Sequence, residues 1–269
     1  MAAIVAVSAL AVLAVVVVWV GVTRTGDDVD ATLADAVDAG DVELARSLLA
    51  GGADPDAPRV HALTPLMRAA IRDDAAMVRV LLGAGADLAA TDNDGQSAWH
   101  VAAQTDSAVA LAALIEAGAD PGSRSRNGMN TFEHAAAWGS VEVIAQVAGL
   151  GVDIDARSEV ITQGHGHPRD VGSTALGIAA RAGQVAAIEL LLGLGAAVDE
   201  PSTTGHSPLM LAVFSDQSPE VVSALLAGGA DPLLAAGSDQ RTALDWAGEL
   251  EREELVPLLE AASDSQAND

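Results

Sequence analysis

The residues with the clearest potential for chemistry lie in one glycine-containing stretch, residues 156–172. Within it, His165 and His167 are separated by a single glycine, and Glu159 and Asp170 lie on either side. Two imidazoles at this spacing can ligate one zinc or nickel ion, but such a site also needs a third ligand and a supporting shell of hydrogen bonds. We expect a solvated loop here, with a metal site at His165 and His167 as the alternative.

The rest of the chain offers no arrangement that supports catalysis. The sequence contains no cysteine, so it has neither a thiolate nucleophile nor a disulfide framework. Serine, threonine and acidic residues are abundant, but no Ser-His-Asp arrangement, phosphate-binding glycine loop or metalloprotease motif stands in a supporting context. We predict that the chain is not an enzyme and that it uses no cofactor.

The strongest pattern in the chain is a repeat of 33 residues. One apolar position recurs at this period and, after two insertions, at wider spacing: Leu33, Leu66, Trp99, Phe132, Leu176, Leu209 and Leu244. The residues around it form a first short motif, such as Thr-Pro-Leu-Met-Arg-Ala-Ala at residues 64–70. A second motif follows at a fixed distance, such as Leu-Leu-Ala-Gly-Gly-Ala-Asp-Pro at residues 48–55. Each repeat is therefore predicted to form two short helices and a turn.

Both ends of these helices carry recognisable stop and start signals. A side chain whose oxygen can cap the first helix occurs in every repeat after the first: Thr64, Ser97, Asn130, Thr174, Ser207 and Thr242. A glycine suited to a left-handed backbone follows the second helix: Gly52, Gly85, Gly118, Gly151, Gly195 and Gly229. The helix boundaries are thus predicted together with the helices.

The period and the residues of the two motifs resemble those of the ankyrin repeat over about residues 28 to 262. The resemblance implies an all-α solenoid of about seven helix–turn–helix units with β-turn fingers, here preceded by one hydrophobic helix. One helix pair cannot bury its apolar face alone, so neighbouring repeats must supply the core. The resemblance also gives His100 a structural role, hydrogen-bonded near Ser97.

Departures from the pattern predict the ends and the insertions. We expect a short linker at residues 24–30, the repeats at 31–262 and a disordered tail at 263–269. Pro257 lies where the last helix should be, so we predict a kinked or frayed end. The spacing from Phe132 to Leu176 is 44 residues, 11 more than the period, which places an insertion at 156–172.

Residues 2–22 carry no charged side chain and consist mainly of Ala, Val, Leu and Ile. As a helix, this segment is about 31 Å long, which is enough to cross a bilayer. We predict a single transmembrane or signal-anchor helix over residues 1–23, with a cleaved signal peptide as the alternative. Arg24 weakly favours a cytoplasmic repeat domain, but long domains are exported regardless of charge, so a periplasmic or other extracytoplasmic location stays open.

The formal net charge of −25 restricts the choice of partner. Nucleic acid binding needs a basic stripe that neutralises phosphates, so we predict no nucleic acid partner. A cationic protein surface fits the charge, although dispersed acids also simply keep a repeat stack soluble and monomeric. We expect a monomeric repeat domain with a protein partner.

The resemblance implies that a partner binds in the groove formed by the first helices and the finger tips. The contact residues predicted on this basis are Arg72, Gln104, Arg124, Arg126, Met129, Trp138, Arg181, His206 and Phe214. The chain has only four Trp and two Phe, so exposing Trp138 and Phe214 is costly unless a partner covers them. The alternative is that both pack against a neighbouring helix.

The sequence thus predicts a membrane-tethered scaffold that binds a protein partner through this groove. Some bacterial ankyrin-like proteins with an N-terminal hydrophobic segment act beside oxidative-stress enzymes, and the layout of this chain is similar. The alternative is therefore a periplasmic accessory protein of an envelope or oxidative-stress enzyme, with metal bound in the loop at 156–172.

Overall fold

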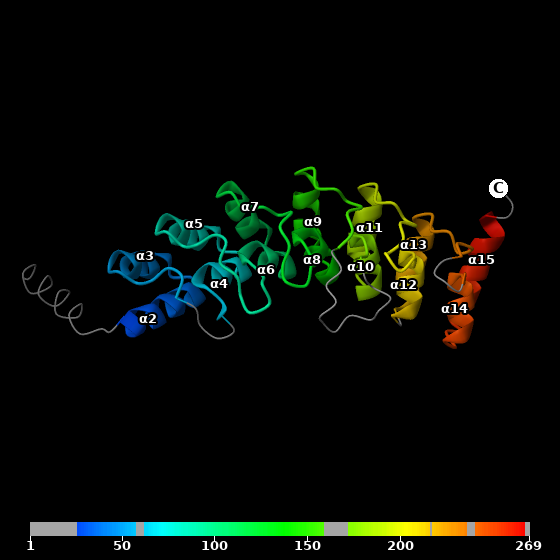
Figure 1. The fold of residues 1–269 in the computed structure, drawn as a ribbon, viewed down its shortest axis with the longest axis horizontal. Coiled ribbons are helices and arrows are strands. Elements are labelled where there is room, and N and C mark those ends of the chain that lie inside the picture. The colour runs from blue at the N-terminus through cyan, green and yellow to red at the C-terminus, as the bar shows by residue number, and fades with distance from the viewer. Residues whose placement is uncertain (1–25, 58–61, 159–171, 216, 236–239, 267–269) are drawn as a thin grey trace, which may run out of the picture.

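The computed structural model describes residues 26–57, 62–158, 172–215, 217–235 and 240–266, and Figure 1 shows them as one elongated stack of helix pairs. Fourteen helices lie in these residues. In chain order they are α2 (Gly26–Ala39), α3 (Val42–Ala50), α4 (Pro65–Ile71), α5 (Ala75–Gly83), α6 (Ala98–Gln104), α7 (Ala108–Glu116), α8 (Thr131–Trp138), α9 (Val141–Ala148), α10 (Ala175–Ala182), α11 (Val185–Gly193), α12 (Pro208–Phe214), α13 (Pro219–Ala227), α14 (Ala243–Glu249) and α15 (Val256–Gln266). The prediction of about seven all-α units is confirmed.

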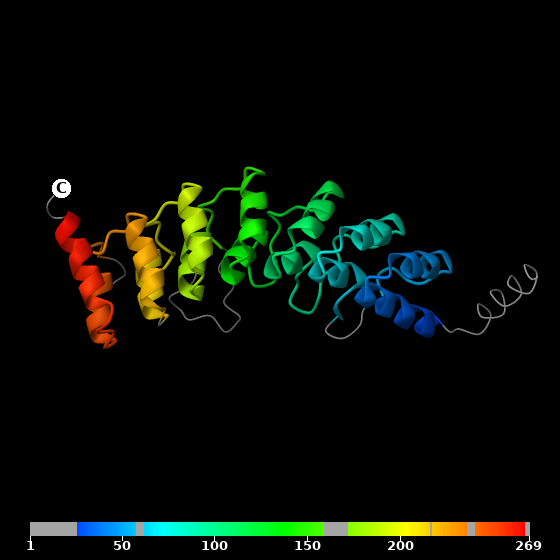
Figure 2. The ribbon, with the colours of Figure 1, turned by 180° about the vertical axis from the view of Figure 1, so that it is seen from behind.

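The helices form two layers. The even-numbered helices, here called the first layer, each pack against the next even-numbered helix, and the odd-numbered helices form the second layer in the same way. Within a repeat, the two helices contact each other. The helix axes turn progressively along the stack, so α3 and α5 at one end point in a different direction from α13 and α15 at the other (Figures 1 and 2).

Small residues decide how closely the first layer packs. The paired alanines of successive repeats, such as Ala69–Ala70 and Ala135–Ala136, are fully buried. The second layer covers them with leucines, including Leu81 and Leu191, which are also fully buried. Each such leucine contributes roughly 1.5–3 kcal/mol by leaving water.

The predicted caps and glycines hold. Thr64 accepts a hydrogen bond from the backbone N–H of Met67 at 3.3 Å, and Thr174 accepts one from Gly177 at 3.3 Å. All six glycines predicted after the second helices have left-handed backbones, with φ between +78° and +99°. The two repeated sequence motifs therefore predict the ends of the helices as well as the helices themselves.

The two ends of the stack differ from the expected boundaries. Helix α2 already begins at Gly26, inside the predicted linker 24–30, and α15 continues to Gln266, inside the predicted tail. The expected kink at Pro257 is wrong. Pro257 is the second residue of α15, where the missing N–H has no partner in the helix and the fixed φ suits the first turn.

The two unusual segments of the sequence lie largely outside the described residues. The predicted membrane span at 2–22 is among them, and within the described part no helix has the length and apolarity needed to cross a membrane. His165 and His167 also lie outside. The insertion leaves the stack at Ser158, whose N–H donates to the carbonyl of Ser173 at 3.0 Å.

Aspartates at the bases of the fingers link one repeat to the next. The carboxylate of Asp56 accepts from the N–H of Asp87 at 2.9 and 3.0 Å, and that of Asp199 accepts from Asp231 at 3.1 Å. Burial raises the pKa of Asp199. Part of the negative charge is therefore structural and not simply a device for solubility.

A second set of polar links joins the loops between the two helices of each repeat. In the first half of the stack, Asp73 and Asp106 accept from backbone N–H groups of the following repeat, those of Ala110 at 2.7 Å and Val143 at 3.1 Å. In the second half, the amide of Gln217 donates to the carbonyl of Arg181 at 2.7 Å. The position of Asp73 and Asp106 is a glycine in the fifth repeat, Gly183, and the link there is made by a glutamine that donates.

The hydrogen bond from Gln217 requires a glycine at position 183, because the Gln217 side chain lies against this residue. Gly183 has a φ of +76°, and a Cβ at this position would lie 2.2 Å from Oε1 of Gln217. We expect Gly183→Ala to lower the free energy of unfolding by about 2–3 kcal/mol, because it combines left-handed strain with a displaced hydrogen bond. Urea unfolding monitored by circular dichroism measures this loss.

Gly193→Ala is the matched control for this prediction. Gly193 is the last residue of α11, and no atom lies within 4 Å of a Cβ added there. This substitution should leave stability unchanged or raise it by up to about 1 kcal/mol, because alanine favours helix over glycine. Equal losses from both substitutions would contradict the proposed role of Gly183.

Candidate protein-binding surface

Trp138 is the most exposed large apolar side chain of the described residues, with 60% of its surface accessible. It is the last residue of α8, and Gly139 ends the helix immediately after it with a left-handed φ of +75°. A tryptophan at a helix end, followed by a glycine, has no further turn to cover it. The structure therefore places Trp138 at the surface, and the alternative that it packs against a neighbouring helix is wrong.

Equivalent positions of the first layer continue this exposed site along the stack. The last turn or cap of α4 contributes Ile71, which is 39% exposed, and Arg72, and the cap of α14 contributes Leu250, which is 42% exposed. We call the set at the C-terminal ends of the first-layer helices the Trp138 ridge: Ile71, Arg72, Thr105, Trp138, Arg181 and Leu250. Adjacent helices lie about 8–10 Å apart, so the ridge can contact an extended segment or a helix of a partner.

Several residues predicted as partner contacts serve the stack itself. Gln104 donates to Oε1 of Gln96 at 2.7 Å and to Nδ1 of His134 at 3.3 Å. Met129 is half-buried and packs against the core. Arg126 is exposed, but its backbone N–H donates to Asp94 at 3.2 Å and its guanidinium donates to the carbonyl of Asn93. It therefore joins two neighbouring fingers.

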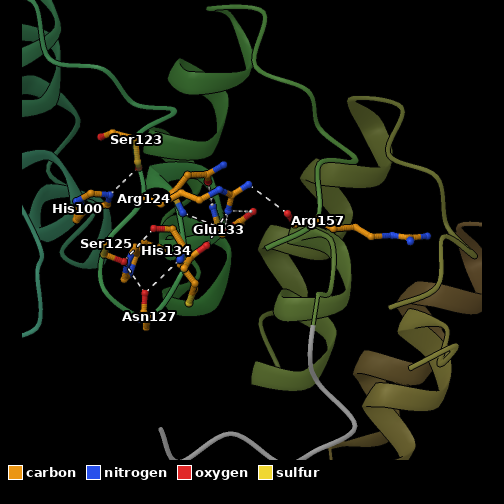
Figure 3. Close-up of polar contacts among 11 residues, drawn as sticks. His100, Ser123, Arg124, Ser125, Asn127, Glu133, His134 and Arg157 are labelled. Atoms are coloured by element: carbon orange, nitrogen blue, oxygen red, sulfur yellow. Dashed lines mark hydrogen bonds and ion pairs between the residues drawn. The ribbon is translucent and has the colours of Figure 1, made fainter. Parts of the chain in front are cut away.

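Arg124 is not the free basic finger residue that the sequence suggested. Its guanidinium donates to both carboxylate oxygens of Glu133 at 3.1 and 3.2 Å, and to the carbonyl oxygens of Gly128 and Arg157 (Figure 3). Glu133 is only 1% exposed and also accepts from the N–H of Asn130 at 2.9 Å. Breaking such a buried pair typically costs 3–5 kcal/mol, so Arg124 belongs to the support of α8.

His134 lies one turn before Trp138 on α8 and is almost fully buried. Its Nδ1 accepts from Gln104, because an amide nitrogen can only donate, so the ring proton resides on Nε2. That N–H points to Oγ of Ser125 at 2.9 Å (Figure 3). The hydroxyl of Ser125 in turn donates to Asn127 or to the carbonyl of Met129.

This Ser–His contact has the wrong polarity for catalysis. A general base must offer an unprotonated nitrogen to the hydroxyl, whereas Nε2 of His134 already carries a proton directed at Ser125. Burial, with a smaller effect of His100, lowers the pKa of His134 to about 3. The pair therefore orders the third finger against α8 and does not form a nucleophile.

His100 lies one repeat earlier, at the third position of α6, which Glu133 occupies in α8, and it has the structural role that the resemblance implied. Its Nδ1 accepts from the N–H of Ser97 at 3.2 Å, and its Nε2 donates to the carbonyl of Ser123 at 2.9 Å. The rings of His100 and His134 meet edge to face with centroids 5.3 Å apart. Burial lowers the pKa of His100 as well, so two neutral imidazoles lie between the third and fourth repeats.

His206 and Phe214 are packed within the stack. Their rings meet edge to face with centroids 5.1 Å apart, and Phe214 contacts Trp246 of the last repeat in the same way at 4.4 Å. The guanidinium of Arg241 lies 4.7 Å from the centre of the Trp246 ring. This cluster joins the sixth and seventh repeats, which leaves Arg72, Trp138 and Arg181 as the predicted contacts located on the ridge.

Sequence reasoning missed Glu133 and His134, the buried residues beneath the ridge, although it predicted the cap Asn130. Asn130 and Glu133 form a capping box, which their spacing of three residues already signals. His134 carries no such signal, because its partners Gln104 and Ser125 come from other segments. Within the described residues, no group of three or more histidine, aspartate or glutamate side chains is arranged to hold a metal ion.

Comparisons with known proteins agree with this architecture. The sequence profile of the family described as ankyrin repeats (3 copies) matches residues 33–125 and 132–236. The crystal structure of the human ASB11 ankyrin repeat domain is similar, with a TM-score of 0.70 and 22% identity, covering 86% of this chain and 96% of that one. The Bcl-3 ankyrin repeat domain, from the IkappaB protein family, has a TM-score of 0.62 and 28% identity, covering 80% and 92%. None of the curated proteins compared with the chain matches it.

The buried state of His134 predicts a pH dependence. Its folded-state pKa of about 3 lies below the ordinary value of 6.5, so the unfolded chain binds the proton first and stability is lost as the pH falls below 6.5. At pH 5 the loss should be roughly 2 kcal/mol relative to pH 7. We expect His134→Gln to lose less free energy of unfolding over this interval than the wild type.

Urea unfolding of both proteins at the two pH values tests this expectation. The other titrating groups are common to both proteins, so the difference between the two losses isolates His134. Parallel pH profiles for the wild type and His134→Gln would show that the histidine does not carry the acid sensitivity.

Proposed function

The chain belongs to the ankyrin repeat family, and from this premise we propose that it is a membrane-tethered scaffold that binds a protein partner along the Trp138 ridge. Ankyrin repeat domains are typically non-catalytic modules for protein–protein interaction. The exposed position of Trp138 carries the proposal for this chain. Its single-pass tether is the apolar segment at residues 2–22, and the cellular side of the repeats is left to experiment.

Composition makes the exposure of Trp138 informative. The chain has four tryptophans and two phenylalanines. Trp99, Phe132 and Trp246 are buried and Phe214 is half-buried in the aromatic cluster, so among the described aromatic residues only Trp138 is exposed. Tryptophan is enriched among residues that dominate binding energy. A partner that covers this ring with apolar side chains removes most of its accessible surface from water.

The support beneath Trp138 also favours binding over a purely structural role. Helix α8 is held by the Arg124–Glu133 ion pair and by the hydrogen bonds of His134, both buried or half-buried. A side chain presented from a rigid element loses little conformational entropy on binding. The overall charge of −25 attracts a cationic partner at long range, while the contact at Trp138 is apolar.

Catalysis is not part of the proposal. The Ser125–His134 contact carries its proton on the nitrogen that faces the serine. The Ser97–His100 contact, 2.7 Å between Oγ and Nδ1, is closed to a substrate because both residues are at most 2% exposed. The alternative role as an accessory protein that binds metal through residues 156–172 receives no support from the described residues, which contain only the edges of that loop. A binding scaffold is the function for which the chain has a suitable surface.

Photo-crosslinking in cells tests the ridge. A photoreactive aromatic amino acid, which keeps an aromatic ring in place of Trp138, should crosslink to a protein partner, whereas the same residue in place of Leu194 should not. Leu194 is the matched control because it is 43% exposed but caps α11 in the second layer. Equal crosslinking at both positions would argue against a specific surface at Trp138.

Two tryptophan substitutions separate binding from stability. Trp138→Ala, in a chain without the photoreactive residue, should abolish co-purification of the partner that crosslinking identified. The thermal midpoint should stay nearly unchanged, because the ring is exposed. Trp99→Ala should instead lower stability by about 3–5 kcal/mol, because Trp99 is buried. A large loss of stability from Trp138→Ala with unchanged binding would assign Trp138 to the core.

The tether is tested by flotation. The full chain should float with membranes through a density gradient and resist a high-salt wash, whereas deletion of residues 2–22 should release the repeats, because the apolar segment holds them at the bilayer. A protease added to cells that carry a tag after Asp269 then shows on which side of the membrane the repeats lie. Loss of the tag before the inner membrane is opened places them outside the cytoplasm, and loss only after it is opened places them inside. Release of the intact full chain by salt alone would contradict the tether.

A further inference from the structure

A groove on the opposite layer from the ridge lies between α3 and α5, in the first two repeats. It has a volume of about 740 Å³ and an apolar floor that includes Val42, Leu49 and Val80. Two arginines, Arg46 and Arg79, border it. We call this feature the α3–α5 groove.

The two arginines occupy the same position in successive repeats. The fifth residue of each second-layer helix is, in order along α3 to α13, Arg46, Arg79, Ala112, Ala145, Glu189 and Ser223. Helices α7, α9, α11 and α13 contain glutamate but no basic residue. Among the described second-layer helices, basic residues therefore occur only in α3, which also carries Glu43, and α5, whereas the later helices carry only acidic charge.

Neither arginine is committed to a strong ion pair. Arg46 lies 4.0 Å from Glu43, and Arg79 lies 3.1 Å from Glu116. The arginine side chains are 62% and 59% exposed, and both glutamates are more exposed still. Exposed pairs of this kind contribute 0–1 kcal/mol, so a phosphate can displace either glutamate.

The position of the groove restricts what can cover it. Thr23, Arg24 and Thr25 separate the apolar segment from the start of α2, and three residues span at most about 11 Å. Helix α2 packs directly against α3. If residues 2–22 cross a bilayer, the first two repeats are the part of the stack that lies next to the lipid headgroups.

We propose that the α3–α5 groove lies on the anionic lipid headgroups of the membrane that holds the tether, with Arg46 and Arg79 binding phosphates. The proposal rests on the tether proposed above. Guanidinium groups bind phosphate oxygens through two parallel hydrogen bonds, and the apolar floor accommodates the glycerol and upper acyl region. The acidic remainder of the second layer is repelled by the same surface, and the turn of the stack directs it elsewhere (Figure 2).

This contact fixes the orientation of the whole scaffold. The second layer of the first two repeats faces the membrane, so the Trp138 ridge, at the loop ends of the first layer, stays accessible to a partner. Electrostatic attraction of this kind acts within about 8 Å at physiological salt. The contact should therefore involve only the first repeats and weaken as salt is added.

Spin labels on the full chain in vesicles test the proposal. The natural sequence has no cysteine, so Ala50→Cys provides a unique label at the groove and Ala227→Cys the matched control. Both alanines are exposed and occupy the same position, in α3 and α13 respectively. The rate at which each spin label collides with a water-soluble relaxing agent is measured in two kinds of vesicle. One is pure phosphatidylcholine, and the other is an equimolar mixture of phosphatidylcholine and phosphatidylglycerol.

The expected result is protection of the A50C label, but not the A227C label, in the vesicles that contain phosphatidylglycerol. Arg46→Gln and Arg79→Gln should each weaken the contact equilibrium about 5-fold, and together they should remove the protection. Arg46→Lys with Arg79→Lys should retain most of it, because the charge is kept. Circular dichroism of each variant checks that the stack remains folded.

Three results would overturn the inference. Equal accessibility of the two labels, with normal flotation, would refute the headgroup contact and leave the tether standing. Protection that is the same without phosphatidylglycerol, or that rises with the ratio of protein to lipid, would indicate apolar contact or a second copy of the chain in the groove. Loss of flotation itself would refute the tether and the headgroup contact together.

Discussion

No repeat of this protein can bury its own apolar face, and the rest of the structure depends on that constraint. A helix pair of 16 to 23 residues has too little interior, so its alanines and leucines must be covered by the next repeat. The core is therefore a continuous line between two helix layers, with fully buried residues in every repeat from Leu33 to Leu259. Stability becomes a sum of neighbouring interfaces, and each interface can differ in chemistry.

The polar links show how these interfaces differ. Aspartates join the early repeats by accepting from backbone N–H groups, as Asp73 does from Ala110, whereas Gln217 donates to a carbonyl in the later repeats. Between the third and fourth repeats, two buried neutral histidines share one network with Gln104 and Ser125. Because protonation opposes this network, acid acts first on one interface of the stack and not evenly on all of them.

Because the backbone repeats, function is carried by positions whose residues change from one repeat to the next. At the ends of the first-layer helices, one such position holds Arg72, Thr105, Trp138 and Leu250 in different repeats, and the rare tryptophan makes it informative. On the second layer, another position changes from Arg46 and Arg79 to Glu189. The two surfaces lie on different layers, so the protein can face a partner and a membrane at the same time.

The sequence by itself determined the architecture, because the 33-residue period, the caps and the glycines are local signals. Thr64 caps its helix and Gly195 is left-handed whatever the neighbours are. It also placed Trp138 at the end of a first-layer helix, but only the structure decided that the ring is exposed and not packed against a neighbouring helix. Only the tertiary structure decided that Arg124 neutralises Glu133 and that His206 and Phe214 pack toward Trp246. These outcomes depend on side chains far apart in the sequence, and the period gives a residue its place in a repeat but not the partner that the adjacent repeat presents to it.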